Sequence, residues 1–409
     1  MRIAVIGGGV AGTAAAWAAR RGLADVTAIF DRAGASSLYS GALDDVPWEE
    51  GGLDAPLDSE VLAFSVALDA WSVGTKSARV ATPDGVLRPA RGRDSSLLDV
   101  AAVTGGRVAV VSTRVDGWDA PVLARSLAES AWARRTRTRF EVVHVDDVFD
   151  AAEGRASVHD LATLHDDPER LKRLAARLRE RRDAPDAWLF GPWLGAAPGV
   201  GEALSQLLGK PCGETTSLPG GPAGARFDVS RDALLANGGV QIRQERIQSL
   251  EPRGKRHLVA GSGGGLTTND GGFDAVILAI GGLVGGGIVL NESAVATDDA
   301  ALASGSLHWG AFRPSVRSRV EIGLSGRTLD RASSERGLDL AALGMTALER
   351  VGILCDGAVA RGASSIFVAG DVVADHPRTA LGAARSGILA ARAALSLARE
   401  VDGEPRAAT

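Results

Sequence analysis

The most constraining feature of this sequence is its first 31 residues. The apolar run 3–6 leads directly into the glycine-rich stretch 7–12, and an alanine-rich segment follows over 13–20. A second apolar run, 26–30, ends at Asp31. This order predicts a strand, a tight turn, a helix, a second strand and a terminal acid, which is the arrangement of a dinucleotide-binding βαβ unit.

Each glycine of the turn has a physical role in that arrangement. Gly7 permits the tight exit from the strand, Gly9 allows the backbone to approach a pyrophosphate, and Gly12 lets the helix lie close to the sheet. Val10 and Ala11 begin the predicted helix, so their backbone N–H groups and the partial positive charge there favour phosphates.

The acid after the second strand adds to the specificity of this pattern. Asp31 is expected to accept hydrogen bonds from an adenosine ribose, with Arg32 beside it in the same site. The alternative is a glycine-rich turn that binds no ligand.

Composition limits the other function classes. A chain of 409 residues is long enough for about two or three structural units. The net charge of −5 gives no bulk electrostatic attraction for nucleic acid. Cys212 and Cys355 are the only cysteines and stand far apart, which argues against a disulfide framework and against a cysteine-ligated iron–sulfur cluster within this chain. A cytoplasmic setting is therefore expected, and any membrane association is expected to be peripheral or through a partner.

A second motif near the C-terminus favours flavin over nicotinamide. The apolar run 365–369 ends in Gly370-Asp371, where an acid at a strand end can meet a ribityl chain. A helix is predicted over 379–398, and Leu381 and Gly382 in its first turn are expected to lie near the flavin ring. The alternative role for Asp371 is to cap the following loop.

Two further segments are expected to approach the cofactor. The small and polar loop 33–44 contains Ser40 and Gly41, and its composition indicates close backbone contact. The buried-type strand 273–280 leads into Gly281 and further glycines.

The fold class predicted from these elements is α/β. We expect an FAD/NAD(P)-binding Rossmann-like domain of the glutathione-reductase type, interrupted by an inserted α/β domain. The FAD-binding domain begins at 1–106, the inserted domain covers 107–200 with alternating strands and helices, and 201–400 completes the first domain. A cap-like segment is expected at 293–350 and a disordered tail at 401–409.

With these pieces in place, the sequence resembles one of the two flavoprotein subunits of anaerobic glycerol-3-phosphate dehydrogenase, the one that is not the main hydride acceptor. The similar stretches lie in the same order along most of the chain: 7–12, 40–44, Pro83-x-Gly85-x-x-Arg88, 110–127, Glu214-x-Thr216-x-Leu218-Pro219, 278–287 and 367–372. The resemblance weakens at 375–382, and 293–350 shows no match.

The resemblance implies oxidation of glycerol 3-phosphate to dihydroxyacetone phosphate, with quinone as the final acceptor. It also implies a second flavoprotein subunit, an iron–sulfur subunit and a place at the inner face of the plasma membrane. FMN is often assigned to the subunit that this chain resembles, whereas Asp31 favours FAD. Two alternatives are a stand-alone FAD-dependent oxidoreductase of another small substrate, and a docking subunit without its own turnover.

The sequence offers only a few candidates for catalytic or anion-binding residues. His376 follows the Gly-Asp motif and is a candidate acid or base, the alternative being an ordinary loop histidine. Arg313 is the other catalytic candidate, and it and Arg226 are candidates for binding a phosphate or carboxylate, the alternative being a solvated basic segment. His159 and His165 are predicted to be surface residues.

Overall fold

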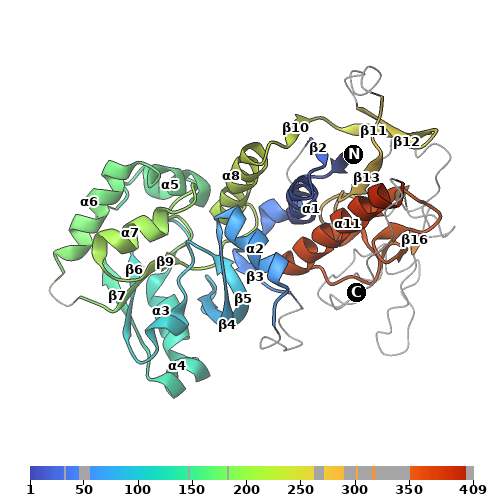
Figure 1. The fold of residues 1–409 in the computed structure, drawn as a ribbon. Helices are drawn as coiled ribbons and strands as arrows, with labels where there is room; N and C mark the ends of the chain where they lie inside the picture. Colours follow the sequence, from blue (N-terminus) through green and yellow to red (C-terminus); the bar gives the residue numbers. More distant parts are fainter. Residues whose placement is uncertain are drawn as a thin grey trace, which may run out of the picture. The chain divides into compact units, whose positions relative to one another are not determined.

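The computed structural model of the chain describes residues 1–31, 34–45, 56–145, 148–181, 184–261, 271–289, 301–302, 316–317 and 351–401 (Figure 1). These residues divide into two compact units. The first draws on Met1–Ser36, Asp45–Pro47 and Ala233–Thr409, and the second on Ser37–Asp44 and Trp48–Asp232. Arg32, Arg313, nearly all of the predicted cap-like segment 293–350 and the predicted tail after 401 lie outside the described residues.

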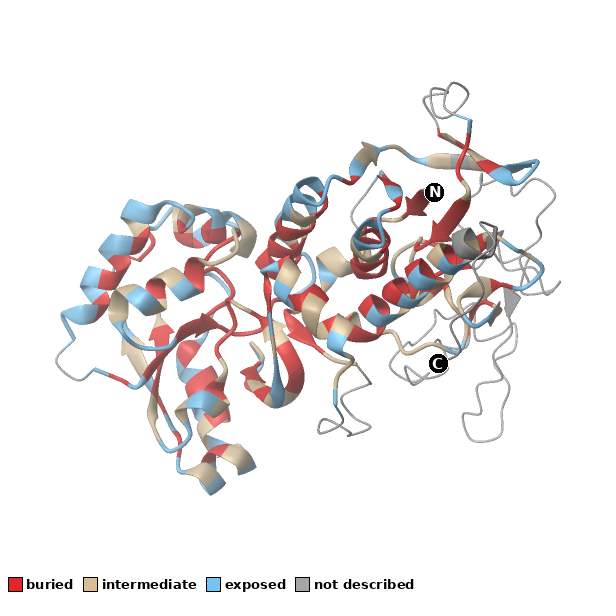
Figure 2. Ribbon diagram, in the orientation of Figure 1, coloured by how far each residue is buried: buried red, intermediate tan, exposed pale blue. Residues whose placement is uncertain are grey.

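A seven-stranded sheet forms the centre of the first unit. Its order is β10-β2-β1-β13-β20-β19-β18, with bounds Gln241–Gln244, Asp25–Phe30, Arg2–Ile6, Ala275–Leu278, Ile366–Val368, Val359–Ala360 and Cys355–Asp356. The first five strands run parallel, and β18 and β19 are antiparallel. β1 and β13 are nearly continuous buried apolar runs, as expected for central parallel strands covered on both faces (Figure 2).

Two helices of the first unit cross at very close range. These are α1 (Val10–Arg21) and α11 (Ala380–Val401), which lie side by side in Figure 1. A Cβ added at Gly387 would lie 2.1 Å from the carbonyl oxygen of Ala11, so only glycine permits this contact. The alanine-rich composition of both helices allows the close approach.

The remaining strands of the first unit form short antiparallel pairs. β11 (Ile247–Arg253) pairs with β12 (Arg256–Gly261), β14 (Ile288–Val289) with β15 (Ala301–Leu302), and β16 (Val316–Arg317) with β17 (Gly352–Ile353). The turn between β11 and β12 contains Gly254 at φ +62°.

The second unit contains a fully parallel four-stranded sheet, β7-β6-β8-β9, with bounds Arg139–His144, Arg107–Ser112, Ala187–Phe190 and Cys212–Glu214. Its helices are α3 (Ala120–Glu129), α4 (Ala131–Thr136), α5 (Val158–Leu164), α6 (Pro168–Arg179) and α7 (Val200–Leu208). α3 and α4 are separate helices, because the Ser130 hydroxyl accepts a hydrogen bond from the Ala133 N–H and starts α4.

This unit extends beyond the inserted domain predicted at 107–200. Its fourth strand, β9, lies after residue 200, and a second sheet precedes residue 107. That sheet contains β3 (Ala42–Leu43), β5 (Leu87–Asp94) and β4 (Trp71–Ala81), and α2 (Ser59–Leu68) precedes β4. The two sheets are joined at a bridge between Leu97 and Glu214. α8 (Pro222–Asn237) follows β9 in the chain.

A buried ionic cluster lies in the core of the second unit. The Arg226 side chain has no exposed surface and donates to Asp94 over 2.9 Å and to Glu214 over 2.8 Å. It also donates to the Gly195 carbonyl, and the Tyr39 hydroxyl donates to Asp94 over 2.9 Å. Arg226 is therefore not part of a solvated basic segment, and that alternative from the sequence is wrong for this residue. Its guanidinium binds two carboxylates of the protein itself.

Among the described residues no helix is long and apolar enough to span a membrane.

Candidate cofactor site

The turn from β1 into α1 requires two of its glycines for packing. Gly7 has φ +122°, and a Cβ added there would lie 2.0 Å from the carbonyl oxygen of Ala279. A Cβ at Gly12 would lie 1.9 Å from the carbonyl oxygen of Gly7. Both distances are far inside contact range. These two glycines therefore serve the backbone crossing of β1, α1 and β13.

Gly9 is different, because a side chain there would meet only a hydroxyl. Its backbone is extended, at φ −76° and ψ −175°, and an added Cβ would lie 3.1 Å from Ser36 Oγ. Gly9 stands at the N-cap of α1 and offers no side-chain cap, and the first turn carries no acid. The Val10 N–H donates to Ser36 Oγ over 2.9 Å. This helix end suits an anion, because no acidic side chain in its first turn opposes the backbone donors and the helix dipole.

The C-terminal motif lies at the neighbouring strand ends of the same sheet. Gly370 follows β20 at φ +74°, and a Cβ added there would lie 2.7 Å from the Ala11 Cβ. Gly281 follows β13 at φ +83°, and a Cβ at Gly282 would lie 2.9 Å from the Asp371 Cβ. The carboxyl ends of β1, β13 and β20 therefore meet at close range, where open parallel sheets bind their ligands.

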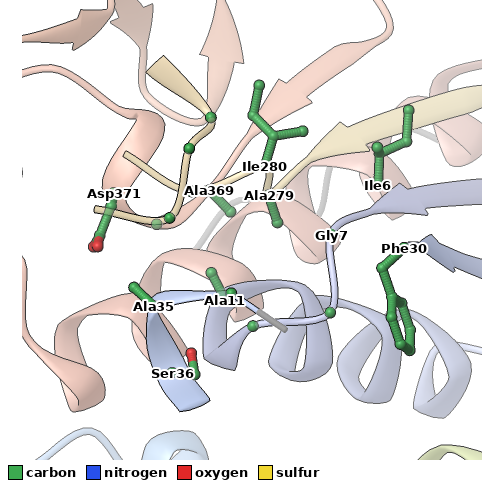
Figure 3. A pocket seen from close by; sticks show the side chains of 18 of the residues that line it. Ile6, Gly7, Ala11, Phe30, Ala35, Ser36, Ala279, Ile280, Ala369 and Asp371 are labelled. Carbon is green, nitrogen blue, oxygen red and sulfur yellow. The ribbon is translucent and has the colours of Figure 1, made fainter. Parts of the chain in front are cut away.

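These strand ends surround a cavity of about 140 Å³. Figure 3 shows Gly7, Ala11, Ser36, Ala369 and Asp371 around it. The predicted residues that line it are Gly7, Gly9, Val10, Ala11, Asp31, Gly281, Gly370 and Asp371. The fold thus brings these eight predicted residues, which come from both ends of the chain and from its later middle part, to one cavity.

Several other predicted residues lie elsewhere. Gly12, Leu381 and Gly382 do not line the cavity. Ala383, in the same helical turn as Leu381 and Gly382, does line it. Ser40 and Gly41 belong to the second unit. There the Ser40 carbonyl accepts from the Ser217 N–H over 2.8 Å and the Gly41 carbonyl accepts from the Asp94 N–H over 2.6 Å.

The sequence also missed lining residues. Ser36 belongs to the 3₁₀ helix η1 (Ala35–Leu38), and Phe30 places its ring against Gly8, where an added Cβ would be 2.6 Å from the ring. Glu245 and Arg246 follow β10, and Gly285–Gly287 follow Gly281. The serine pair Ser36-Ser37, five residues after Asp31, was a usable signal. Residues 245 and 246 could be placed at the cavity only from the sheet order.

Burial shifts the pKa values of Asp371 and His376, the two ionisable groups that follow Gly370. The pKa of Asp371 is raised by burial, and Arg378 and His376 act against that shift. The pKa of His376 is lowered by burial, and its Nε2 lies 3.3 Å from the Gly382 carbonyl oxygen. His376 does not line the cavity, so its role as an acid or base stays a prediction.

The structure also describes the surroundings of His165 and Cys355. His165 is 1% exposed, so the prediction that it is a surface residue is wrong. Cys355 lies in β18 and is half-buried, with its pKa raised to about 11 by burial. Among the described residues no group of His, Cys, Asp and Glu side chains is arranged to hold a metal ion.

The comparisons with known proteins identify no family. No family model and no curated protein matches this chain, so the resemblance to the glycerol-3-phosphate dehydrogenase subunit stays a prediction. Among solved structures, glycine oxidase from Geobacillus kaustophilus is similar at a TM-score of 0.34 and 14% identity, covering 99% of this chain and 96% of its own. Cyclohexylamine oxidase from Brevibacterium oxydans has a TM-score of 0.33 and 14% identity, covering 98% and 99%.

A third similar structure is CtdE, crystallised in complex with FAD, at a TM-score of 0.35 and 10% identity, covering 98% of this chain and 88% of its own.

Proposed function

We propose that this chain is an FAD-dependent oxidoreductase. One observation carries the proposal: the glycine turn after β1 and the Gly370-Asp371 segment after β20 come from opposite ends of the chain and line one cavity. The first motif suits a pyrophosphate and the second suits a polyol chain held by an acid, and FAD contains both groups.

The residues around the cavity have distinct roles in holding FAD. Gly9 and the first N–H groups of α1 would face the pyrophosphate, and Asp31 would accept from the adenosine ribose. Asp371 would accept from the ribityl hydroxyls, provided that its carboxylate is ionised. When bound, FAD supplies the two-electron chemistry at its ring system. The chain itself binds, orients and shields that group.

The cofactor identity has a direct test. Asp31 at the end of β2 fits a site for an adenosine ribose, which FMN lacks. We expect purified protein to release FAD on denaturation, as identified by chromatography of the released flavin. Release of FMN alone would contradict the role given to Asp31.

We further propose that the chain acts as a dehydrogenase subunit in the oxidation of glycerol 3-phosphate to dihydroxyacetone phosphate. The support is the resemblance along most of the chain to a flavoprotein subunit of the anaerobic enzyme. With only two cysteines the chain cannot itself ligate a four-cysteine iron–sulfur cluster. It would therefore pass electrons toward quinone through an iron–sulfur partner and work beside a second flavoprotein subunit, at the cytoplasmic side of the membrane.

The subunit role is tested by reconstitution. The chain alone, given glycerol 3-phosphate and a soluble quinone analogue, should show negligible turnover. Addition of a second flavoprotein subunit and an iron–sulfur subunit should restore it. Full turnover by the chain alone would refute the relay role and leave a stand-alone oxidoreductase. A colourless protein that does not bind added FAD would refute the flavin proposal itself.

A further inference from the structure

A second cavity, of about 350 Å³, lies wholly within the second unit. It is bounded by α6 and by the segment around Val148 and Phe149 that follows β7. Leu174, Val148 and Phe149 are buried and give it an apolar wall. Its size is within the range of small-molecule sites. Neither the proposed cofactor nor the sequence motifs use this cavity.

His165 gives the cavity lining a buried hydrogen-bond acceptor. The Nδ1 atom of His165 lies 2.9 Å from the Trp193 carbonyl oxygen. Because a carbonyl oxygen only accepts, Nδ1 carries the proton and Nε2 bears a lone pair. Nε2 is buried and has no hydrogen-bond partner among the described residues. A buried acceptor without a donor is costly, so this site favours a ligand that donates a hydrogen bond.

Arg170 of α6, which also lines the cavity, is already neutralised by an acidic residue of the lining. Arg170 binds Glu153 through two hydrogen bonds, of 2.8 and 2.7 Å, and donates to the Val148 carbonyl over 2.9 Å. The hydrogen bond from Arg170 lowers the pKa of Glu153 to about 2, so the pair is ionised at neutral pH. This pair fixes the shape of the cavity and leaves no charge for a ligand.

Two other arginines of α6 also line the cavity. Arg173 and Arg177 are one helical turn apart, so their side chains extend from the same face. Both side chains are exposed. Arg173 forms no ion pair with a described residue, and Arg177 Nη1 forms an ion pair with Glu180 Oε2 over 3.8 Å. The one other acid of the described lining, Asp150, accepts from the N–H groups of Ala152 and Glu153. Guanidinium groups in this position suit a phosphate or carboxylate.

We propose that this cavity binds a small organic anion that carries a hydroxyl group. Arg173 and Arg177 bind the oxyanion, and the hydroxyl donates to His165 Nε2. The carbon body lies against Phe149 and Leu174.

The test is isothermal titration calorimetry with two probes. The first is 3-phosphoglycerate, which carries two anionic groups and a hydroxyl, and the second is inorganic phosphate, which has no carbon-bound hydroxyl. We expect both to bind the full chain, and 3-phosphoglycerate to bind more tightly. Arg173→Gln and Arg177→Gln should each weaken both probes by about tenfold or more, the effect of losing one charge-assisted hydrogen bond.

Lys172→Gln is the matched control, because Lys172 is on the same helix, is exposed and does not line the cavity. It should leave both affinities within about twofold. Equal weakening by all three variants would show diffuse attraction to a basic helix and overturn the proposal. Absence of heat for both probes with the unmodified chain would overturn it as well.

A His165 variant tests the hydroxyl contact separately. His165→Asn keeps a donor that can reach the Trp193 carbonyl but removes the Nε2 acceptor. It should weaken 3-phosphoglycerate by about tenfold and leave inorganic phosphate unchanged, with folding checked by circular dichroism. An unchanged affinity for 3-phosphoglycerate in a folded variant would refute the role of His165.

Discussion

The glycines of the first turn should separate flavin binding from folding. In Gly9→Val the new side chain faces Ser36 Oγ, 3.1 Å from the Cβ position, and the backbone is in an extended conformation that valine adopts readily. Replacing an N-cap glycine by an apolar residue costs about 1 kcal/mol. In Gly12→Ala the Cβ would lie 1.9 Å from the Gly7 carbonyl oxygen, so backbone must move. We expect that change to cost about 3 kcal/mol or more.

The expected effects on flavin are the reverse of those on stability. Gly9→Val places two methyl groups where a pyrophosphate would approach the helix N-terminus. Loss of one charge-assisted hydrogen bond to phosphate costs about 1.5–3 kcal/mol, which is roughly a 10- to 150-fold loss of FAD affinity. The variant should therefore fold and lack flavin.

The assay pairs two measurements on the flavin-free protein. Urea unfolding followed by circular dichroism gives the free energy of unfolding, and titration with FAD followed by flavin fluorescence gives the dissociation constant. Gly9→Ala is the graded control, with a smaller loss of affinity than Gly9→Val. If Gly9→Val bound FAD like the unmodified chain, the phosphate placement would be wrong. If Gly12→Ala were as stable as the unmodified chain, the packing role of Gly12 would be wrong.

Three further predictions concern buried charges. Arg226→Met leaves the Asp94 and Glu214 carboxylates without their cation and should lower the free energy of unfolding by about 3–5 kcal/mol in a urea titration. Burial outweighs the Arg226 ion pair and raises the pKa of Glu214 from 4.5 to about 7. The folded chain thus holds this proton more tightly than the unfolded chain. The free energy of unfolding should therefore fall as pH rises from about 4.5 to 7, by up to about 1.4 kcal/mol per pH unit. If the free energy of unfolding of a Glu214→Gln chain had the same pH dependence, this prediction would be wrong. Asp371→Ala should weaken FAD binding by roughly 5- to 150-fold in the fluorescence titration, and an unchanged affinity would exclude a ribityl contact.

The sequence was sufficient where local chemistry determines local structure. The strand, turn and helix at 1–21 were predictable because glycine conformation and apolar periodicity are local properties. The same holds for β20, which ends two residues before Gly370. Those two patterns also predicted most of the cavity lining. Glu245 and Arg246 reach it because β10 pairs with β2, and that pairing has no local signature.

The burial of polar residues was predicted wrongly where contacts between distant parts of the fold determine it. Arginine is mostly exposed in folded proteins, and histidine is intermediate between the buried and the exposed residue types. Arg226 is buried because Asp94 and Glu214, 132 and 12 residues away in the sequence, neutralise it. His165 is buried because the Trp193 carbonyl oxygen satisfies one of its nitrogens. None of these three partners could be identified from the sequence next to Arg226 or His165.

The sheet order of the first unit has a consequence for the way the chain is made. β1 pairs with β2 on one side and with β13 on the other, in the register Ile3 to Ala275, and β13 pairs in turn with β20. During synthesis the N-terminal βαβ segment leaves the ribosome long before either later strand exists, while most of the second unit is contiguous in sequence. One edge of β1 therefore remains unpaired while most of the polypeptide is synthesised. Pairing between strands so far apart in the sequence is slow. Nascent chains of this protein are consequently candidates for chaperone binding at their first strand.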